Sequence, residues 1–198
     1  ANRNLSMYSF FRPLLFKLDP ETAHHPALQL IRLGAYQPFN FLLRAMYTTP
    51  GKPVEAFGLH FPNPVGLAVG YDKDGLAWRG LATLGFGHIE VGTVTPCPKP
   101  GNPKPRVFRL VDDRALINRM GFPGLGADDL ARRLQVRPLS RRFYRNEKQV
   151  IEGVNLGKNK DTLLENAAED YLALMRQFAP LADYLAINVS SPNTVGLR

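Results

Sequence analysis

The feature that most constrains the fold is an alternation of strand-like and helix-like segments after residue 62. Short apolar runs typical of buried strands lie at 65–69, 88–91, 150–156 and 184–189. Helical patterns lie between them at 75–84, 127–135 and 163–178. Strands that alternate with helices in this way pair in parallel. We therefore expect an α/β protein, either doubly wound or containing half of a (β/α)8 barrel.

Glycine or polar residues follow each predicted strand at its carboxyl end. They are Gly70 and Lys73, Gly92 and Thr93, Asn155, and Asn188. The glycine fingerprint of dinucleotide-binding folds and the phosphate loop of nucleotide hydrolases are both absent from the sequence. A barrel gathers its strand ends on one face, where amides and hydroxyls can bind a flat heterocycle. This placement favours a (β/α)8 barrel that holds a planar polar cofactor. Since a whole barrel needs about 250 residues, these 198 supply half of one.

Two further extended regions are expected. A small hairpin is predicted over 54–61, with its turn near Gly58. A Pro- and Gly-rich excursion covers 95–105, and short extended pieces follow at 107–110 and 115–118.

Residues 8–50 differ from the rest of the chain. Asp19, Pro20 and Glu21 form the start signal of a helix over 21–34, and Pro38 begins a second helix. Both helices are rich in Leu and Phe, with basic residues between them. Two interpretations stay open: a pair of helices lying on a membrane surface, or a pair packed on the neighbouring domain.

Composition excludes several classes of protein. A single cysteine without a Cys-x-x-Cys pair argues against a disulfide framework or a zinc site, so no metal is expected. No apolar run reaches the roughly 20 residues that span a bilayer. The net charge of +8 arises largely from basic residues at 132–148, which we interpret as a solvated face and only weak support for RNA binding.

The last predicted strand ends in a polar loop, Ser190-Ser191-Pro192-Asn193-Thr194. Hydroxyl and amide groups held at the end of a buried strand suit a functional site on a parallel β/α scaffold. The same residues also suit an ordinary proline turn. From this loop alone the two interpretations are equally supported.

Six segments, taken in order, carry a resemblance to a known family. They are Asn63–Gly75, Gly85–Pro96, Gly101–Leu110, Ile117–Phe122, Gly153–Lys160 and Asn188–Arg198. Together they resemble class 2 dihydroorotate dehydrogenases, the membrane-associated enzymes that use quinone. The resemblance implies a (β/α)8 barrel and a flavoprotein oxidoreductase of de novo pyrimidine biosynthesis. Such an enzyme oxidises (S)-dihydroorotate to orotate, with FMN as hydride acceptor and a membrane quinone as final acceptor.

The resemblance also assigns residues. FMN would contact Ala68, Val69, Gly70, Tyr71, Asp72, Thr93, Asn155 and Asn188. Dihydroorotate would contact Lys73, Asn118, Arg119, Met120, Gly121, Phe122, Asn188 and Asn193. Val69 stands where the family commonly has alanine, and Tyr71 where it has leucine or phenylalanine. Both FMN contacts are expected to be made by the backbone.

Ser191 matches the catalytic base of the family, and the resemblance implies that it removes the C5 proton while hydride leaves C6. Serine needs help to act as a base, which Thr194, a water and the covering Phe122 would give. Soluble class 1 relatives have cysteine at this position, and Cys97 lies elsewhere in the sequence. His24 and Arg109 match positions near the quinone. Plausible lining residues of the quinone route are Leu14, Leu15, Leu18, Phe39 and Leu42.

The resemblance divides the chain at residue 50. Residues 1–50 would be a helical segment for membrane contact and quinone access, and 51–198 the first half of an FMN-binding barrel. The other half would follow Arg198 and close the barrel. The protein would lie on the cytoplasmic side of a bacterial inner membrane, without a nucleic-acid partner. The alternatives are a soluble class 1 enzyme, a basic FMN-dependent enzyme resembling tRNA dihydrouridine synthases, and a non-catalytic membrane-binding module.

Overall fold

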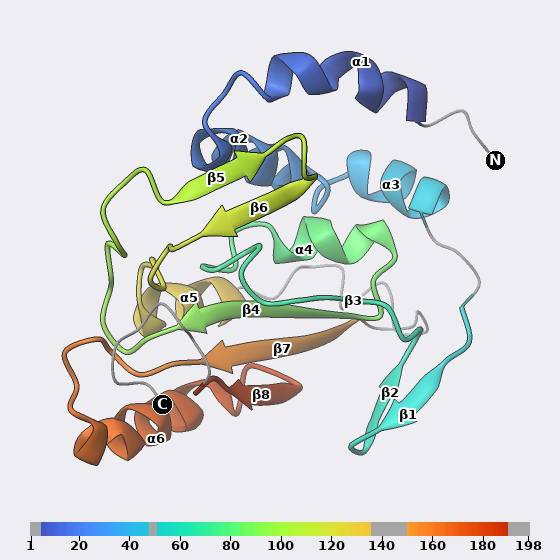
Figure 1. Cartoon of the computed structure of the whole chain (residues 1–198). Coiled ribbons are helices and arrows are strands. Elements are labelled where there is room, and N and C mark those ends of the chain that lie inside the picture. Colours follow the sequence, from blue (N-terminus) through green and yellow to red (C-terminus); the bar gives the residue numbers. More distant parts are fainter. Residues whose placement is uncertain (1–4, 48–50, 136–149, 190–198) are drawn as a thin grey trace.

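The computed structural model describes residues 5–47, 51–135 and 150–189. Its centre is a parallel sheet of four strands, β3 (Gly66–Leu67), β4 (His88–Val94), β7 (Ile151–Leu156) and β8 (Tyr184–Ile187) (Figure 1). The strands lie side by side in the order in which they occur in the chain. A doubly wound sheet reverses its strand order at a switch point, whereas a barrel does not. The order therefore identifies the first half of a (β/α)8 barrel.

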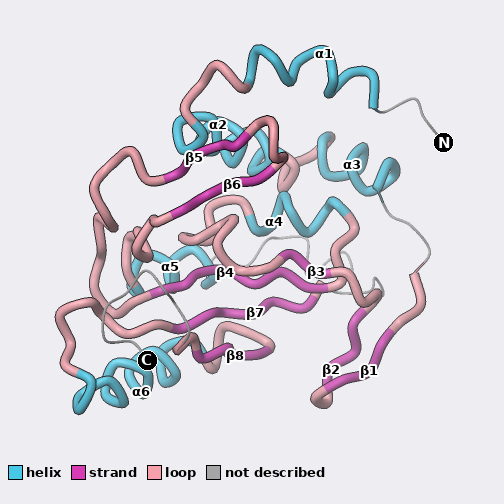
Figure 2. Tube along the Cα trace, in the orientation of Figure 1, coloured by secondary structure: helices cyan, strands magenta, loops and turns pink. Residues whose placement is uncertain are grey.

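Helices follow the strands as predicted. They are α4 (Trp78–Leu81) continued by the 3-10 turn η1 (Ala82–Leu84), α5 (Ala127–Gln135), and the turn η3 (Leu164–Asn166) continued by α6 (Ala167–Phe178). Helix α6 packs on β7 and β8, and α5 packs on α6 (Figure 2). The core between sheet and helices includes the fully buried Val91, Val154, Leu156 and Phe178. Burial of such side chains contributes roughly 1.5–3 kcal/mol each.

The first strand and first helix are shorter than the sequence predicts. The segment 68–77 between them is irregular, and the side chain of Asp72 holds part of it in a turn. The carboxylate of this buried residue accepts hydrogen bonds from the backbone N–H groups of Leu76 and Ala77, at 2.8 and 2.7 Å. These bonds hold residues 72–77 in a loop after β3, and α4 begins only at Trp78.

The predicted hairpin over 54–61 is confirmed, and the two extended pieces predicted at 107–110 and 115–118 pair as a second hairpin. One pairs β1 (Val54–Ala56) with β2 (Leu59–Phe61), and the other pairs β5 (Val107–Leu110) with β6 (Ala115–Asn118). Strand β5 packs against α2, so the second hairpin lies between the N-terminal helices and the sheet (Figure 1).

Within residues 5–47 the structure has three helices, so the prediction of two is incomplete. They are α1 (Leu5–Leu15), α2 (Pro20–Leu33) and α3 (Phe39–Tyr47). The additional helix α1 contains Pro13, which the sequence analysis left without a helical assignment. Helix α2 begins as predicted, because the Asp19 side chain accepts a hydrogen bond from Thr22 N at 2.9 Å and Pro20 follows it.

The N-terminal helices have one packed side and one exposed side. Leu28 of α2 joins the main core, α2 packs on α4, and α3 packs on η1. Many apolar side chains of residues 10–46 are exposed: Phe10, Phe11, Leu14, Leu15, Leu18, Leu30, Leu33, Phe39, Phe41, Leu42 and Met46. Over the described ranges, no helix combines the length and apolar character needed to cross a bilayer. The division of the chain at residue 50 stays a prediction.

Candidate functional site

A cavity of about 580 Å³ lies between α2, the carboxyl ends of the parallel strands and the β5–β6 hairpin. It gathers residues predicted for the cofactor, the substrate and the quinone. The cofactor residues that line it are Ala68, Val69, Gly70, Tyr71, Thr93 and Asn188. The substrate residues are Lys73, Asn118, Met120, Gly121 and Phe122, besides Asn188, and the quinone residues are His24 and Arg109. Residues far apart in the sequence, from Pro20 to Asn188, thus meet at one site.

Three polar side chains at the strand ends form one hydrogen-bond network. The hydroxyl of Thr93 donates to Asn155 Oδ1 at 2.6 Å. Asn188 Nδ2 lies 3.2 Å from both Thr93 Oγ1 and Asn155 Oδ1. Asn155 does not line the cavity, and its role in the described structure is to hold the other two side chains at the cavity wall.

Glu90 and Tyr184 support this network from inside the half-barrel. Asn155 Nδ2 donates to Glu90 Oε1 at 2.8 Å, and the Tyr184 hydroxyl donates to Glu90 Oε2 at 3.0 Å. Burial and the neighbouring Glu90 raise the pKa of Tyr184 above its usual value, so this phenol remains a donor. Because a carboxylate only accepts hydrogen bonds, it fixes the amide of Asn155 with Oδ1 towards Thr93.

The loop after β3 provides a backbone edge and a cation. Gly70 has a φ of 103°, a conformation that favours glycine, and space beside it is open. Lys73 Nζ donates to Gly70 O at 2.5 Å and reaches the cavity. Burial lowers the pKa of Lys73, although the nearby carboxylates of Asp74 and Glu21 oppose this effect.

Asp72 stands apart from the other residues of this loop. Its side chain is 1% exposed, does not line the cavity and is occupied by Leu76 N and Ala77 N. Burial raises the pKa of Asp72, and the two backbone donors oppose this rise. Its contact with FMN stays a prediction.

Tyr71 and His24 connect the predicted flavin and quinone regions. Their rings meet edge to face with 5.0 Å between centroids. Desolvation is the main cause that lowers the pKa of His24, with the cationic Lys73 acting in the same direction. Arg109 lies on β5, donates to Leu18 O at 2.6 Å and stacks on Phe16 at 4.8 Å. The five residues suggested to line a quinone route are exposed and do not line this cavity.

Asn118, Met120, Gly121 and Phe122 of the segment 118–122 line the cavity. Gly121 and Phe122 both have positive φ angles, 70° and 52°, which turn the chain at the cavity wall. Arg119 does not line the cavity, since its guanidinium donates to Pro105 O at 3.2 Å and lies 5.5 Å from the Phe108 ring. Ser191, Asn193 and Thr194 lie outside the described residues.

The chain matches a family of known proteins. A family profile described as "Dihydroorotate dehydrogenase" matches residues 53–198. The chain belongs to the dihydroorotate dehydrogenase family. The resemblance stated from the six sequence segments is thereby confirmed.

Curated relatives agree with this dihydroorotate dehydrogenase assignment. A protein named dihydroorotate dehydrogenase (quinone) from Roseiflexus sp. is 53% identical over 196 residues, which are 98% of this chain and 52% of the relative. A protein of the same name from Pseudomonas savastanoi pv. phaseolicola is 52% identical over 193 residues, 97% of this chain and 53% of the relative. The chain spans about half the length of the curated relatives it matches.

Solved structures of a dihydroorotate dehydrogenase also resemble the chain. The enzyme from Eimeria tenella in complex with ferulenol has a TM-score of 0.77 and 45% identity, covering 90% of this chain and 46% of that one. Its ligand-free form has a TM-score of 0.77 and 44% identity, covering 90% of this chain and 48% of that one. The likeness confirms the barrel fold and its N-terminal helices.

Sequence reasoning missed several residues of this site, among them four polar ones that support its walls. Glu90 and Tyr184 support the amide network, and Glu21 and Arg106 connect α2 to the loop before β5. For Glu90 a signal existed, because a carboxylate stands between the apolar Ile89 and Val91 of the strand His88–Val94. The other pairings join residues 85 to 94 positions apart, and no local pattern predicts them.

Proposed function

We propose that this chain is part of an enzyme that oxidises dihydroorotate to orotate, with FMN as the first electron acceptor and a quinone as the second. The observation that carries the proposal is the single cavity shared by the strand ends, segment 118–122 and helix α2. The relatives named as quinone-dependent enzymes support the same reaction.

The cavity wall fits an FMN ring in its chemistry. The loop 68–71 offers backbone groups beside an unobstructed Gly70, and the Thr93–Asn155–Asn188 network offers a preorganised hydroxyl and amide. Lys73 adds a cation at the same wall, which suits a ring that gains negative charge. FMN, when bound, supplies the hydride-accepting chemistry that no side chain has.

Substrate binding is assigned to side chains of the same cavity, two of which also face the proposed FMN position. Asn118 and Asn188 present amides that can pair with the N–H and C=O groups of a cyclic imide, as would Asn193. Lys73 is placed to pair with the substrate carboxylate. Phe122 covers the reacting position and excludes water.

Ser191 is the proposed base, assisted by Thr194. Both follow the end of β8, the strand whose neighbour Asn188 lines the cavity. A serine in this role requires a partner that accepts its proton, and Thr194 with a water would provide that route.

Quinone access is assigned to the N-terminal helices. His24 and Arg109 line the cavity on the side of α2 and β5, and α1 and α3 carry exposed apolar side chains. Monomeric soluble proteins rarely expose apolar patches of this kind without a partner. We propose that this surface contacts a membrane and that the enzyme is peripheral, on the cytoplasmic side in a bacterial cell. The reaction would serve pyrimidine biosynthesis.

The test is dihydroorotate-dependent reduction of a quinone analogue by the purified full-length protein, with and without detergent. We expect turnover that depends on both substrates and rises with detergent, because the apolar helices then have a surface to bind. A flavin-loaded protein that leaves the quinone analogue unreduced under both conditions would contradict the proposal.

A further inference from the structure

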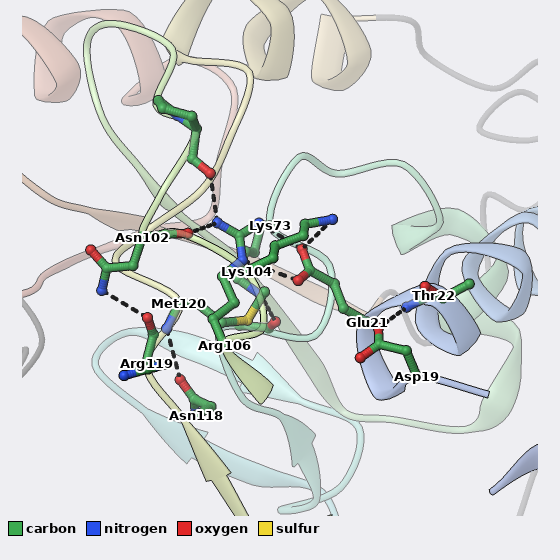
Figure 3. Close-up of polar contacts among 12 residues, drawn as sticks. Asp19, Glu21, Thr22, Lys73, Asn102, Lys104, Arg106, Asn118, Arg119 and Met120 are labelled. Atoms are coloured by element: carbon green, nitrogen blue, oxygen red, sulfur yellow. Dashed lines mark hydrogen bonds and ion pairs between the residues drawn. The ribbon is translucent and has the colours of Figure 1, made fainter. Parts of the chain in front are cut away.

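Arg106 lies in the proline-rich loop before β5, and its side chain is buried, with 6% exposed. Its Nε and Nη2 donate to the two carboxylate oxygens of Glu21, at 3.0 and 2.6 Å. Its Nη1 donates to the carbonyl oxygens of Pro100 and Asn102, at 2.6 and 2.9 Å. A single guanidinium thus joins helix α2 to the loop 100–106 (Figure 3).

The same loop holds the backbone of the predicted substrate segment. Asn102 N donates to Met120 O at 2.9 Å, and Asn102 Nδ2 donates to Arg119 O at 2.7 Å. Arg119 N donates to Arg106 O at 2.8 Å. Met120 and Gly121 line the cavity, so the loop 100–106 acts as the backing of the cavity wall.

Glu21 is the link from this wall to α2. It lies in the first turn of the helix, lines the cavity, and has 19% of its side chain exposed. The hydrogen bonds from Arg106 hold the pKa of Glu21 below its usual value, so the carboxylate is ionised at neutral pH. Replacing Glu21 by a neutral group would leave a buried guanidinium without its counter-charge, which forces the loop to rearrange.

We propose that Glu21 and Arg106 form a positioning pair for the substrate segment 119–121. The docking of α2 then sets the affinity of the site for dihydroorotate and orotate, in addition to any role of α2 towards quinone. The pair acts through Asn102 and the backbone of Met120. This inference rests on the function proposed above, because it takes 119–121 to be part of the substrate site.

The test uses the full-length, flavin-loaded enzyme and titrates orotate while following the change in flavin absorbance. Glu21→Gln should keep its flavin but bind orotate at least tenfold more weakly, with losses of up to about 100-fold for a displaced binding group. The isosteric amide keeps the volume of Glu21 and removes the charge, so the effect reports on the ion pair.

Two control variants separate the ion pair from its surroundings. Lys104 Nζ lies 3.4 Å from the same Glu21 carboxylate but is 68% exposed, so Lys104→Met should change orotate affinity by less than about twofold. Asp19→Ala removes the cap of α2 while leaving Glu21 and Arg106 intact, and should also preserve orotate affinity.

The outcomes discriminate clearly. Wild-type orotate affinity in Glu21→Gln would overturn the proposal, and so would an equal loss in Asp19→Ala, which would assign the effect to helix stability. Should Glu21→Gln lose its flavin, Glu21→Asp is titrated instead; weakened orotate binding supports the pair, and unchanged binding overturns it. A wild-type enzyme that fails to bind orotate would instead refute the proposed function itself.

Discussion

Asp72 offers a quantitative test of how the cofactor loop is held. This side chain is 1% exposed and accepts the backbone N–H groups of Leu76 and Ala77, at 2.8 and 2.7 Å. Hydrogen bonds to a charged group contribute roughly 1.5–3 kcal/mol each, and the cost of burying this carboxylate offsets part of that, so Asp72→Ala should destabilise the protein by about 2–4 kcal/mol. Asp72→Asn keeps one acceptor oxygen and should lose about half of that amount.

The assay is equilibrium unfolding in urea of the full-length protein and its variants, with flavin content measured in parallel. Asp74→Ala is the matched control. Asp74 Oδ1 also accepts a backbone N–H, that of Leu125 at 2.8 Å, but this bond is exposed and should contribute about 1 kcal/mol. If Asp72→Ala and Asp74→Ala lost the same free energy of unfolding, the assignment of Asp72 as the residue that turns the loop would be wrong.

Three further predictions concern catalysis, the N-terminal helices and pH. The Ser191→Ala variant should retain FMN, but the rate at which dihydroorotate reduces its flavin, measured by stopped flow, should fall on the order of 10²–10⁴-fold. A reduction rate near that of the wild type would remove Ser191 from the mechanism. Deleting residues 1–18 should lower quinone turnover in membranes and spare single-turnover flavin reduction. Deleting residues 1–50 should impair both activities, because Leu28 belongs to the core. Equal effects of the two deletions would contradict a separate role of residues 1–18 in quinone turnover. The pKa of Glu21 in the folded protein lies below the ordinary value of 4.5. The ionised carboxylate therefore stabilises the fold above pH 4.5, and this stabilisation is lost as the pH falls through the folded-state pKa. The stability difference between wild type and Glu21→Gln should therefore shrink in urea titrations below about pH 4.5, and a constant difference would count against the ion pair.

The sequence correctly predicted the elements that are determined by residues close together in the chain. Helix α5 has the predicted bounds Ala127–Gln135, because Leu130 and Leu134 repeat at helical spacing with acids in the first turn and arginines in the last. The hairpin strands Val107–Leu110 and Ala115–Asn118 also agree with the prediction. In each case the residues that decide the structure are close together in the chain.

Long-range contacts account for what the sequence analysis missed. The late start of α4 is set by the carboxylate of Asp72, which accepts the N–H groups of Leu76 and Ala77. The amide orientation in Asn155 depends on Glu90, 65 positions away, and the cavity wall depends on the pairing of Glu21 with Arg106. Charged residues at these positions are equally typical of a solvated surface, so only the fold distinguishes the two cases.

The most direct test of the central claim is an anaerobic single turnover. Dihydroorotate is mixed with the full-length, FMN-loaded protein, the flavin absorbance is followed, and a quinone analogue is then added. The proposed function predicts loss of the oxidised flavin spectrum with one orotate formed per flavin, followed by full recovery of the spectrum on addition of quinone. A flavin spectrum that does not respond to dihydroorotate would contradict the account.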